Sequence, residues 1–182
     1  MNPPREQNLE AKLNLIKFPT NTALTYELDE NVPWVQALLI EMNETATDKK
    51  PTEWLLETSL KISIQLVKKF KNEYGEYLLA TGHFACDFVT ESVRSLKTVK
   101  ESMDVEFKAV FFQESILKGE EFTDLDEMWV DGDTYEIYPY EKATADIAEM
   151  LHEQLFLNRN PYPVAEDEME ADASFESDKP RQ

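Results

Sequence analysis

The sequence predicts an α+β fold: an antiparallel β-sheet of about five to six strands, open or barrel-like, with two packed helices and a disordered acidic C-terminal tail. Three long segments, 60–70, 77–89 and 102–112, alternate apolar with other residues, as strands with one buried face do. Two further segments, 29–44 and 142–158, repeat their apolar residues at the helical period. These two helices are the predicted cover of the apolar sheet face.

Shorter patterns predict the remaining elements in the first half. The runs 12–19 and 23–28 alternate and predict two early strands or a hairpin. Pro33 suits the first turn of the first helix, because its missing N–H is not needed there. The stretch NEYGE between the first two long strands predicts a tight hairpin turn in which Gly75 adopts a positive φ.

The second half predicts a loop, a strand and a helix. Residues 118–133 form an acidic stretch that predicts a loop, and the residues from Asp131 to Asp133 within it predict a turn. Residues 134–140 predict an extra strand, and Pro161 ends the last helix.

This order divides the chain into three parts. We expect a flexible N-terminus at 1–11, a single α+β domain at 12–163 and a disordered acidic tail at 164–182. The tail is polar, acidic and poorly periodic, which is typical of a segment without a core of its own.

The net charge of −19 is concentrated in the last third of the chain. Residues 119–182 carry 19 acidic and 4 basic side chains, whereas residues 61–118 carry 8 acidic and 9 basic ones. Affinity for phosphate comes from cation contacts, so this distribution argues against DNA binding and against non-specific RNA binding over the whole surface. An RNA contact is expected only in the middle segment, and the acidic end favours basic partners.

The composition also bounds the compartment. Cys86 is the only cysteine, which excludes an internal disulfide and fits a reducing environment. The sequence has neither the apolar core of a secretory signal nor a membrane-length apolar segment. We therefore expect a cytoplasmic protein without a membrane contact.

Little in the sequence suits catalysis. His83 and Cys86 have opposite parity in one predicted strand, so they point to opposite faces and do not form a nucleophile–base pair. Cys86 is expected to be a buried core thiol. The acidic loop does not match EF-hand spacing, and no phosphate-binding loop is present. We expect a binding protein with no catalytic residue, cofactor or metal; an enzyme using buried carboxylates is the remaining alternative.

Basic side chains in the predicted sheet have two interpretations. They could form an RNA-binding patch beside Tyr74, Tyr77 and His83, whose rings could stack on bases. They could instead be the solvated face of the sheet, with the lysines of 68–71 protecting an exposed edge. The second interpretation is favoured, since no RNP-type aromatics or GXXG loop occur. The residues concerned are Lys61, Lys68, Lys69, Lys71, Arg94, Lys97, Lys100 and Lys108.

Three motifs resemble one family. Residues 82–86 (GHFAC) match a strand pattern G-x-φ-x-φ, and residues 92–96 (SVRSL) match C-x-R-C-L with serine in place of both cysteines. The last helix and its exit through Pro161 and Pro163 resemble an L-x-L-x-x-P-x-x-P ending. In this order the motifs resemble the YceD family of bacteria and plastids, which is linked to accumulation of large-subunit ribosomal RNA. The similarity in layout covers roughly residues 12–165.

The resemblance implies a non-enzymatic factor in large ribosomal subunit biogenesis that binds ribosomal RNA or a ribosomal protein. Arg94 is the expected anchor, because a guanidinium binds phosphate or carboxylate with two hydrogen bonds. The alternative is an acidic chaperone-like scaffold that holds a basic protein through its tail and acidic loop. The expected partner-binding residues are Arg94, Lys97, Lys100, Lys68, Lys69 and Lys71.

The serines are the main departure from the family pattern. If the family cysteines belong to a metal site, Ser92 and Ser95 are poor replacements, because serine hydroxyls bind zinc weakly at neutral pH. We therefore predict a metal-free protein in which both serines are turn residues that hydrogen-bond their own backbone.

Overall fold

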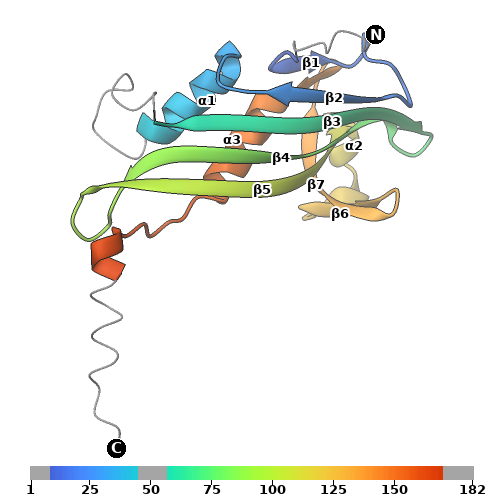
Figure 1. Ribbon diagram of the computed structural model, residues 1–182. Helices are drawn as coiled ribbons and strands as arrows, with labels where there is room; N and C mark the ends of the chain where they lie inside the picture. The colour runs from blue at the N-terminus through green and yellow to red at the C-terminus, as the bar shows by residue number, and fades with distance from the viewer. Residues whose placement is uncertain (1–8, 45–56, 170–182) are drawn as a thin grey trace, which may run out of the picture.

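A computed structural model describes residues 9–44 and 57–169 (Figure 1). The predicted α+β class is confirmed. The main sheet has six strands in the order β2-β3-β4-β5-β7-β6, and a second sheet pairs β1 with β8. The strands are β1 (Lys12–Asn14), β2 (Ala23–Leu28), β3 (Ser59–Lys71), β4 (Gly75–Glu91), β5 (Thr98–Gln113), β6 (Glu127–Val130), β7 (Asp133–Tyr140) and β8 (Thr144–Asp146).

The main sheet is mixed, which corrects the prediction of an antiparallel sheet. Strands β2 to β5 are antiparallel neighbours, but β7 runs parallel to β5. After β5 the chain passes through α2 (Glu114–Leu117) and the 3₁₀ turn η2 (Glu120–Phe122) before it forms β6 at the sheet edge. It then turns back as β7, which enters the sheet between β6 and β5. The strand β6 lies in the segment predicted as a loop, and it sets the direction of β7.

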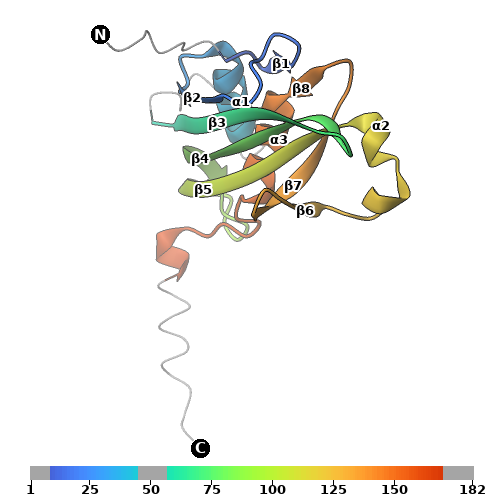
Figure 2. The ribbon, with the colours of Figure 1, turned by 90° about the vertical axis from the view of Figure 1, so that its right-hand side faces the viewer.

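The described strands do not close into a barrel. Strands β2 and β6 stand at opposite edges of the main sheet and do not pair with each other (Figure 2). The barrel-like alternative is therefore wrong for the described part of the chain.

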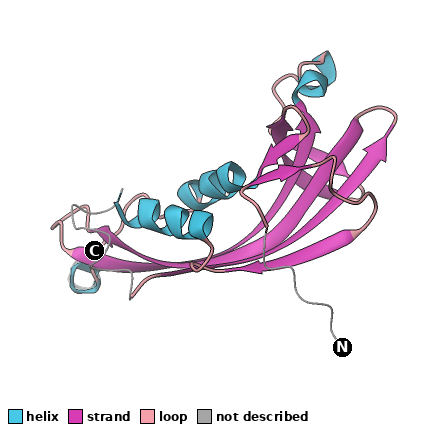
Figure 3. Cartoon of the chain, turned by 90° about the horizontal axis from the view of Figure 1, so that it is seen from above, coloured by secondary structure: helices cyan, strands magenta, loops and turns pink. Residues whose placement is uncertain are grey.

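One face of the long strands packs on two helices, as predicted. Figure 3 shows these helices together on one side of the strands. They are α1 (Pro33–Glu44) and α3 (Ile147–Leu157), and their buried residues join the alternating residues of the strands in one core. Asp146 caps α3 by accepting a hydrogen bond from the Glu149 N–H at 3.0 Å.

A second, smaller core lies on the opposite face of the sheet, at the end formed by the β3–β4 turn. There Tyr77, Leu79, Val110 and Phe112 have the parity that faces away from the helices, yet all are buried. The unbroken apolar runs YLLA and AVFF reflect burial on both faces at this end. Residues from η2, β6 and β7 supply the cover, namely Phe122, Val130 and Tyr135.

Glycines occupy positions in the main sheet and its turns where a residue with a side chain would fit poorly. A Cβ added to Gly82 would lie 2.0 Å from the carbonyl oxygen of Ser63 on β3, so this position tolerates no side chain. Gly75 has φ of 70° in the β3–β4 turn, which confirms the predicted hairpin. Asp131 and Gly132, with φ of 49° and 92°, form the β6–β7 turn, which confirms the predicted turn there.

The described residues include a few on the outer side of each predicted domain boundary. At the start, Leu9 is buried, and the carbonyl of Ala11 accepts a hydrogen bond from Ile147 N–H at 2.9 Å. At the end, residues 166–169 form a helical turn. The remainder of the two predicted flexible segments, 1–8 and 170–182, lies outside the described residues. Within the described part, no helix is long and apolar enough to cross a membrane.

Candidate functional site

The six predicted partner-binding cations divide between the two ends of the sheet. Lys68, Lys69 and Lys71 lie where β3 meets the β3–β4 turn, which we call the hairpin end. Arg94 and Lys97 lie in the β4–β5 loop (residues 92–97) and Lys100 follows on β5; we call this the loop end. Strand β4 joins the two ends with 17 residues, which span at most about 56 Å along the strand at about 3.3 Å per residue. A single cationic patch is not formed.

Lys68 is part of the core side of the sheet. It has the same parity as the buried Ile64 and Leu66, and only 4% of it is exposed. Its ammonium donates to the carbonyl of Leu15 at 2.7 Å and lies 3.6 Å from a Glu76 carboxylate oxygen. The expectation that Lys68 protects an open edge is wrong. Because side chains alternate between the two faces of a strand, the sequence alone places Lys68 on the same inward face as Ile64 and Leu66.

Lys69 and Lys71 bind one carboxylate, that of Asp131 in the β6–β7 turn. Each ammonium lies 3.0 Å from an Asp131 oxygen, and the Tyr77 hydroxyl donates to the same carboxylate at 3.1 Å. Desolvation opposes the charged carboxylate, but hydrogen bonds from Lys71, Lys69 and Tyr77 outweigh it and lower the pKa of Asp131 to about 2. This group ties the β6–β7 hairpin to the β3–β4 hairpin.

The predicted stacking tyrosines also belong to the hairpin end. Tyr77 is buried, and Tyr74 packs edge-on against Phe112 with ring centroids 5.3 Å apart. These contacts use the rings to complete the second core, so Tyr77 presents no face to a base.

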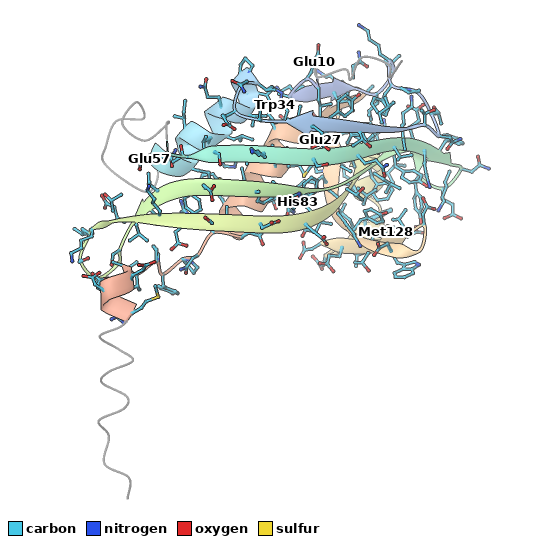
Figure 4. The ribbon with its side chains drawn as sticks, in the orientation of Figure 1. Glu10, Glu27, Trp34, Glu57, His83 and Met128 are labelled. Carbon is cyan, nitrogen blue, oxygen red and sulfur yellow. The ribbon has the colours of Figure 1, made fainter. Side chains whose placement is uncertain are left out.

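The exposed part of the sheet face turned away from the helices carries basic side chains that lie beside acidic ones. His83 lies on the middle of this face, 2.7 Å from Asp104 (Figure 4). Lys108 lies 2.6 Å from Asp133. Asp87 on the same face accepts hydrogen bonds from the hydroxyls of Ser59 and Ser102. The structure favours the solvated-face interpretation for these residues.

Ser92 organises the loop end from a fully buried position. Its hydroxyl oxygen accepts from the Arg94 N–H at 3.2 Å and from the Ser95 N–H at 3.4 Å. The Ser95 oxygen accepts from the Lys97 N–H at 3.4 Å. The predicted role of both serines in a turn is confirmed.

The β4–β5 loop also holds the C-terminal segment, residues 163–169. The Ser92 hydroxyl donates to the Glu168 carboxylate at 2.6 Å, and the Val93 N–H donates to the Pro163 carbonyl at 3.0 Å. The ammonium of Lys97 lies 2.9 Å from Asp167. Hydrogen bonds from Ser92 and Ser95 lower the pKa of Glu168. Sequence reasoning missed this contact, because nothing local in residues 163–169 signals it.

The donor set at the loop end does not fit a structural zinc site. It consists of two hydroxyls and carboxylates, whereas such sites use cysteine thiolates and histidines. Among the described residues, no group of three or more His, Cys, Asp or Glu side chains is placed to hold a metal ion.

The other two cations of the loop end are exposed. Lys100 pairs with Glu57 at 2.9 Å, and Arg94 stands near the tip of the β4–β5 loop. Beside it, Leu96 adopts a left-handed φ of 58°, with 71% of its surface exposed. Both Arg94 and Leu96 are therefore on the outer surface of the loop.

Two other candidate sites offer weaker chemistry. Cys86 is buried as predicted, and burial raises the pKa of its thiol to about 12, so thiolate chemistry is disfavoured. A hollow of about 440 Å³ beside β7 and β8 is lined by lysines and carboxylates, including Lys12, Glu114 and Glu141. A hydrogen bond between Glu114 and Glu141 raises the pKa of Glu114.

The acidic stretch forms the far edge of the sheet. Residues 120–129 contain five acidic side chains and no basic one. The residues EMWV within it form β6, with Val130 buried and Glu127 and Trp129 exposed. Their alternation was the sequence signal for this strand, but it extends over only four residues.

Across the described residues, the fold and these surfaces define an α+β protein whose open main sheet is covered on one face by two helices and several of whose lysines pair with carboxylates of the same chain. The model of the family described as "Large ribosomal RNA subunit accumulation protein YceD" matches residues 80–180. Because the match covers more than half of the chain, the protein belongs to the YceD family, as its motifs indicated. Searches of curated proteins and of solved structures found no match.

Proposed function

We propose that the protein is a non-enzymatic factor in the accumulation of large-subunit ribosomal RNA, and that it acts by holding a basic ribosomal protein. The family description supports the process. The observation that carries the choice of partner is the pairing of the lysines. Lys97, Lys100, Lys69 and Lys71 each contact a carboxylate of the same chain at 2.9–3.0 Å.

This pairing weakens the case for RNA as the partner. Phosphate binding gains its free energy when cations replace the counterions of the nucleic acid. A lysine that already holds a carboxylate must first lose that contact, and the net charge of −19 over the whole chain repels phosphate. The same field attracts a lysine- and arginine-rich protein.

Holding such a protein would serve RNA accumulation in a simple way. A basic protein without its RNA site binds other polyanions non-specifically. An acidic partner occupies the same cations until a specific ribosomal RNA site binds them more tightly, and this competition is set by mass action.

A direct ribosomal RNA contact is the second candidate, because Arg94 is exposed near the tip of the β4–β5 loop. In this mechanism Arg94 is the anchor, and Lys97 and Lys100 assist once their carboxylates are displaced. Arg94→Ala is then expected to weaken binding without unfolding the domain.

Capture of the tagged protein from its own cell lysate, with and without ribonuclease, separates the two candidates. We expect a basic large-subunit ribosomal protein to remain bound after ribonuclease treatment, and Arg94→Ala to capture it as well as the wild type does. Loss of the partner with ribonuclease, together with loss of RNA in Arg94→Ala, would instead establish the RNA contact. Deletion of 170–182 tests whether this part of the acidic tail holds the basic partner, and it leaves Asp167 and Glu168 in place.

A further inference from the structure

Strand β6 presents an open edge of the main sheet. It is the last strand in the order β2-β3-β4-β5-β7-β6, and on its other side no described strand pairs with it (Figure 2). The β6–β7 hairpin has a two-residue turn between Val130 and Asp133, and the Ile137 N–H donates to the Asp126 carbonyl at 2.9 Å. In an antiparallel pair, residues alternate between hydrogen-bonded and non-hydrogen-bonded positions. The N–H and C=O groups of Glu127 and Trp129 therefore point away from β7, toward the open edge.

The side chains of the same two residues are also exposed. Trp129 has 69% of its surface exposed, and the nearby Leu125 has 47% exposed. Met128, which alternates with them, packs against the second core (Figure 4). A tryptophan on a rigid strand is a typical anchor of a protein interface, because it buries a large area with little loss of side-chain freedom.

The charge around this edge defines what it can bind. Glu127 lies on the strand itself, and the chain leading to it carries four more carboxylates without a lysine or arginine. The additional acidic residues are Glu120, Glu121, Asp124 and Asp126. A second copy of the chain is a poor occupant, because pairing two β6 edges would bring these like charges together.

We propose that the β6 edge binds an extended, lysine- or arginine-rich polypeptide segment by strand addition, with Trp129 as its apolar anchor. Main-chain hydrogen bonds to Glu127 and Trp129 would supply the pairing, and the carboxylates would select cationic side chains. The identification of this segment with part of a ribosomal protein rests on the proposed function. The binding mode itself rests on the edge, the tryptophan and the charge.

The test uses the full-length protein and a fluorescein-labelled peptide in which lysine alternates with valine, with fluorescence anisotropy as the readout. Trp129→Ala and Glu127→Lys are each expected to weaken binding about tenfold or more. Their controls are Tyr162→Ala and Glu10→Lys, the same kinds of change at other exposed positions, which are expected to leave binding unchanged.

A second peptide tests strand pairing without altering the protein. N-methylation of alternate backbone nitrogens removes the hydrogen bonds but keeps every charge and side chain. We expect the methylated peptide, in the register that blocks the paired nitrogens, to bind at least about tenfold more weakly. Two methylated peptides, one for each set of alternate nitrogens, are compared with the unmethylated peptide. Strand addition would be overturned if both methylated peptides bound as tightly as the unmethylated one, or if Trp129→Ala left binding unchanged.

Capture from lysate separates this inference from the proposed function. If the wild type and Trp129→Ala capture the same ribosomal protein equally, the β6 edge is not its site, although the proposed function stands. If the wild type binds the unmethylated peptide but captures no ribosomal protein, the binding site stands and the proposed function fails.

Discussion

The two ends of the long strands both contain lysine–carboxylate contacts, but in different settings. At the hairpin end, Asp131 is 25% exposed in its side chain and holds Lys69, Lys71 and the Tyr77 hydroxyl above a second core. At the loop end, the side chains of Lys97 and Asp167 are 60% and 64% exposed.

Solvent screens an exposed ion pair, so it contributes little to the free energy of unfolding, whereas a partly buried group with several donors contributes more. The hairpin end therefore contributes more to the stability of the fold than the exposed Lys97–Asp167 ion pair of the loop end does.

The largest expected effect is at the hairpin end. Phe112→Ala removes a fully buried ring between Tyr74, Tyr77 and Phe122 and is expected to lower the free energy of unfolding by about 3–5 kcal/mol. Denaturant unfolding measures this. Leu96→Ala at the loop end is the control, with an expected change within about 0.5 kcal/mol; similar losses in both variants would contradict the comparison.

Lys68 and Lys69 are neighbours with opposite expected behaviour. Lys68→Ala removes the ammonium donor of the Leu15 carbonyl, which keeps only the longer hydrogen bond from the Phe18 N–H at 3.3 Å, and is expected to cost about 1–3 kcal/mol. Lys69→Ala breaks a contact that is about a third exposed, and the expected cost is below about 1 kcal/mol. Equal thermal midpoints for the two variants would show that Lys68 is not structural.

Asp131 predicts a pH dependence at the hairpin end. Its folded-state pKa of about 2 lies below the ordinary value of 3.8, so its contribution to stability is complete above that value and is lost as the pH falls toward 2. Asp131→Asn is therefore expected to cost about 1–2 kcal/mol at neutral pH and progressively less below about pH 4.

Unfolding curves of Asp131→Asn and the wild type at several pH values measure this difference. A pH-independent difference would contradict the role of the carboxylate charge. Asp167→Asn is the matched change at the loop end, and we expect no measurable loss of stability there.

Ser92 tests the contact between the β4–β5 loop and the C-terminal segment. Ser92→Ala removes the bond to Glu168 and two bonds within the turn, for an expected cost of about 1 kcal/mol. The Val93 N–H, which donates to Pro163, should exchange with solvent faster than in the wild type. Ser115→Ala, at an exposed position outside the loop end, is the control; unchanged exchange in Ser92→Ala would argue against the contact.

The smallest expected effect concerns metal. Because hydroxyls stand where thiolates would be needed, a chelator should leave the thermal midpoint of the protein unchanged. One equivalent of zinc in protein purified without a tag or chelator, measured by elemental analysis, would contradict this prediction.

Much of the fold followed from local periodicity. The three long strands, both covering helices, the turn at Gly75 and the buried Cys86 were predicted from residues close together in the sequence. The four-residue strand β6 was not, because so short an alternation is lost within an acidic stretch. The parallel pairing of β5 with β7 depends on β6, so it was missed for the same reason.

The site was less predictable than the fold. Strand parity could have placed Lys68 inside the sheet, but the partners of Lys69, Lys71 and Lys97 come from residues 60 or more positions away in the chain. No local pattern carries this information. The six predicted partner-binding cations therefore form two groups at opposite ends of the sheet.

The most direct test of the central claim measures RNA binding itself. A fluorescently labelled fragment of large-subunit ribosomal RNA is titrated with the full-length protein at physiological ionic strength, and anisotropy is recorded for the wild type and Arg94→Ala. If the protein acts by holding a basic protein, neither should bind the RNA saturably. Saturable binding that weakens with salt and is lost in Arg94→Ala would contradict the account and make RNA the partner.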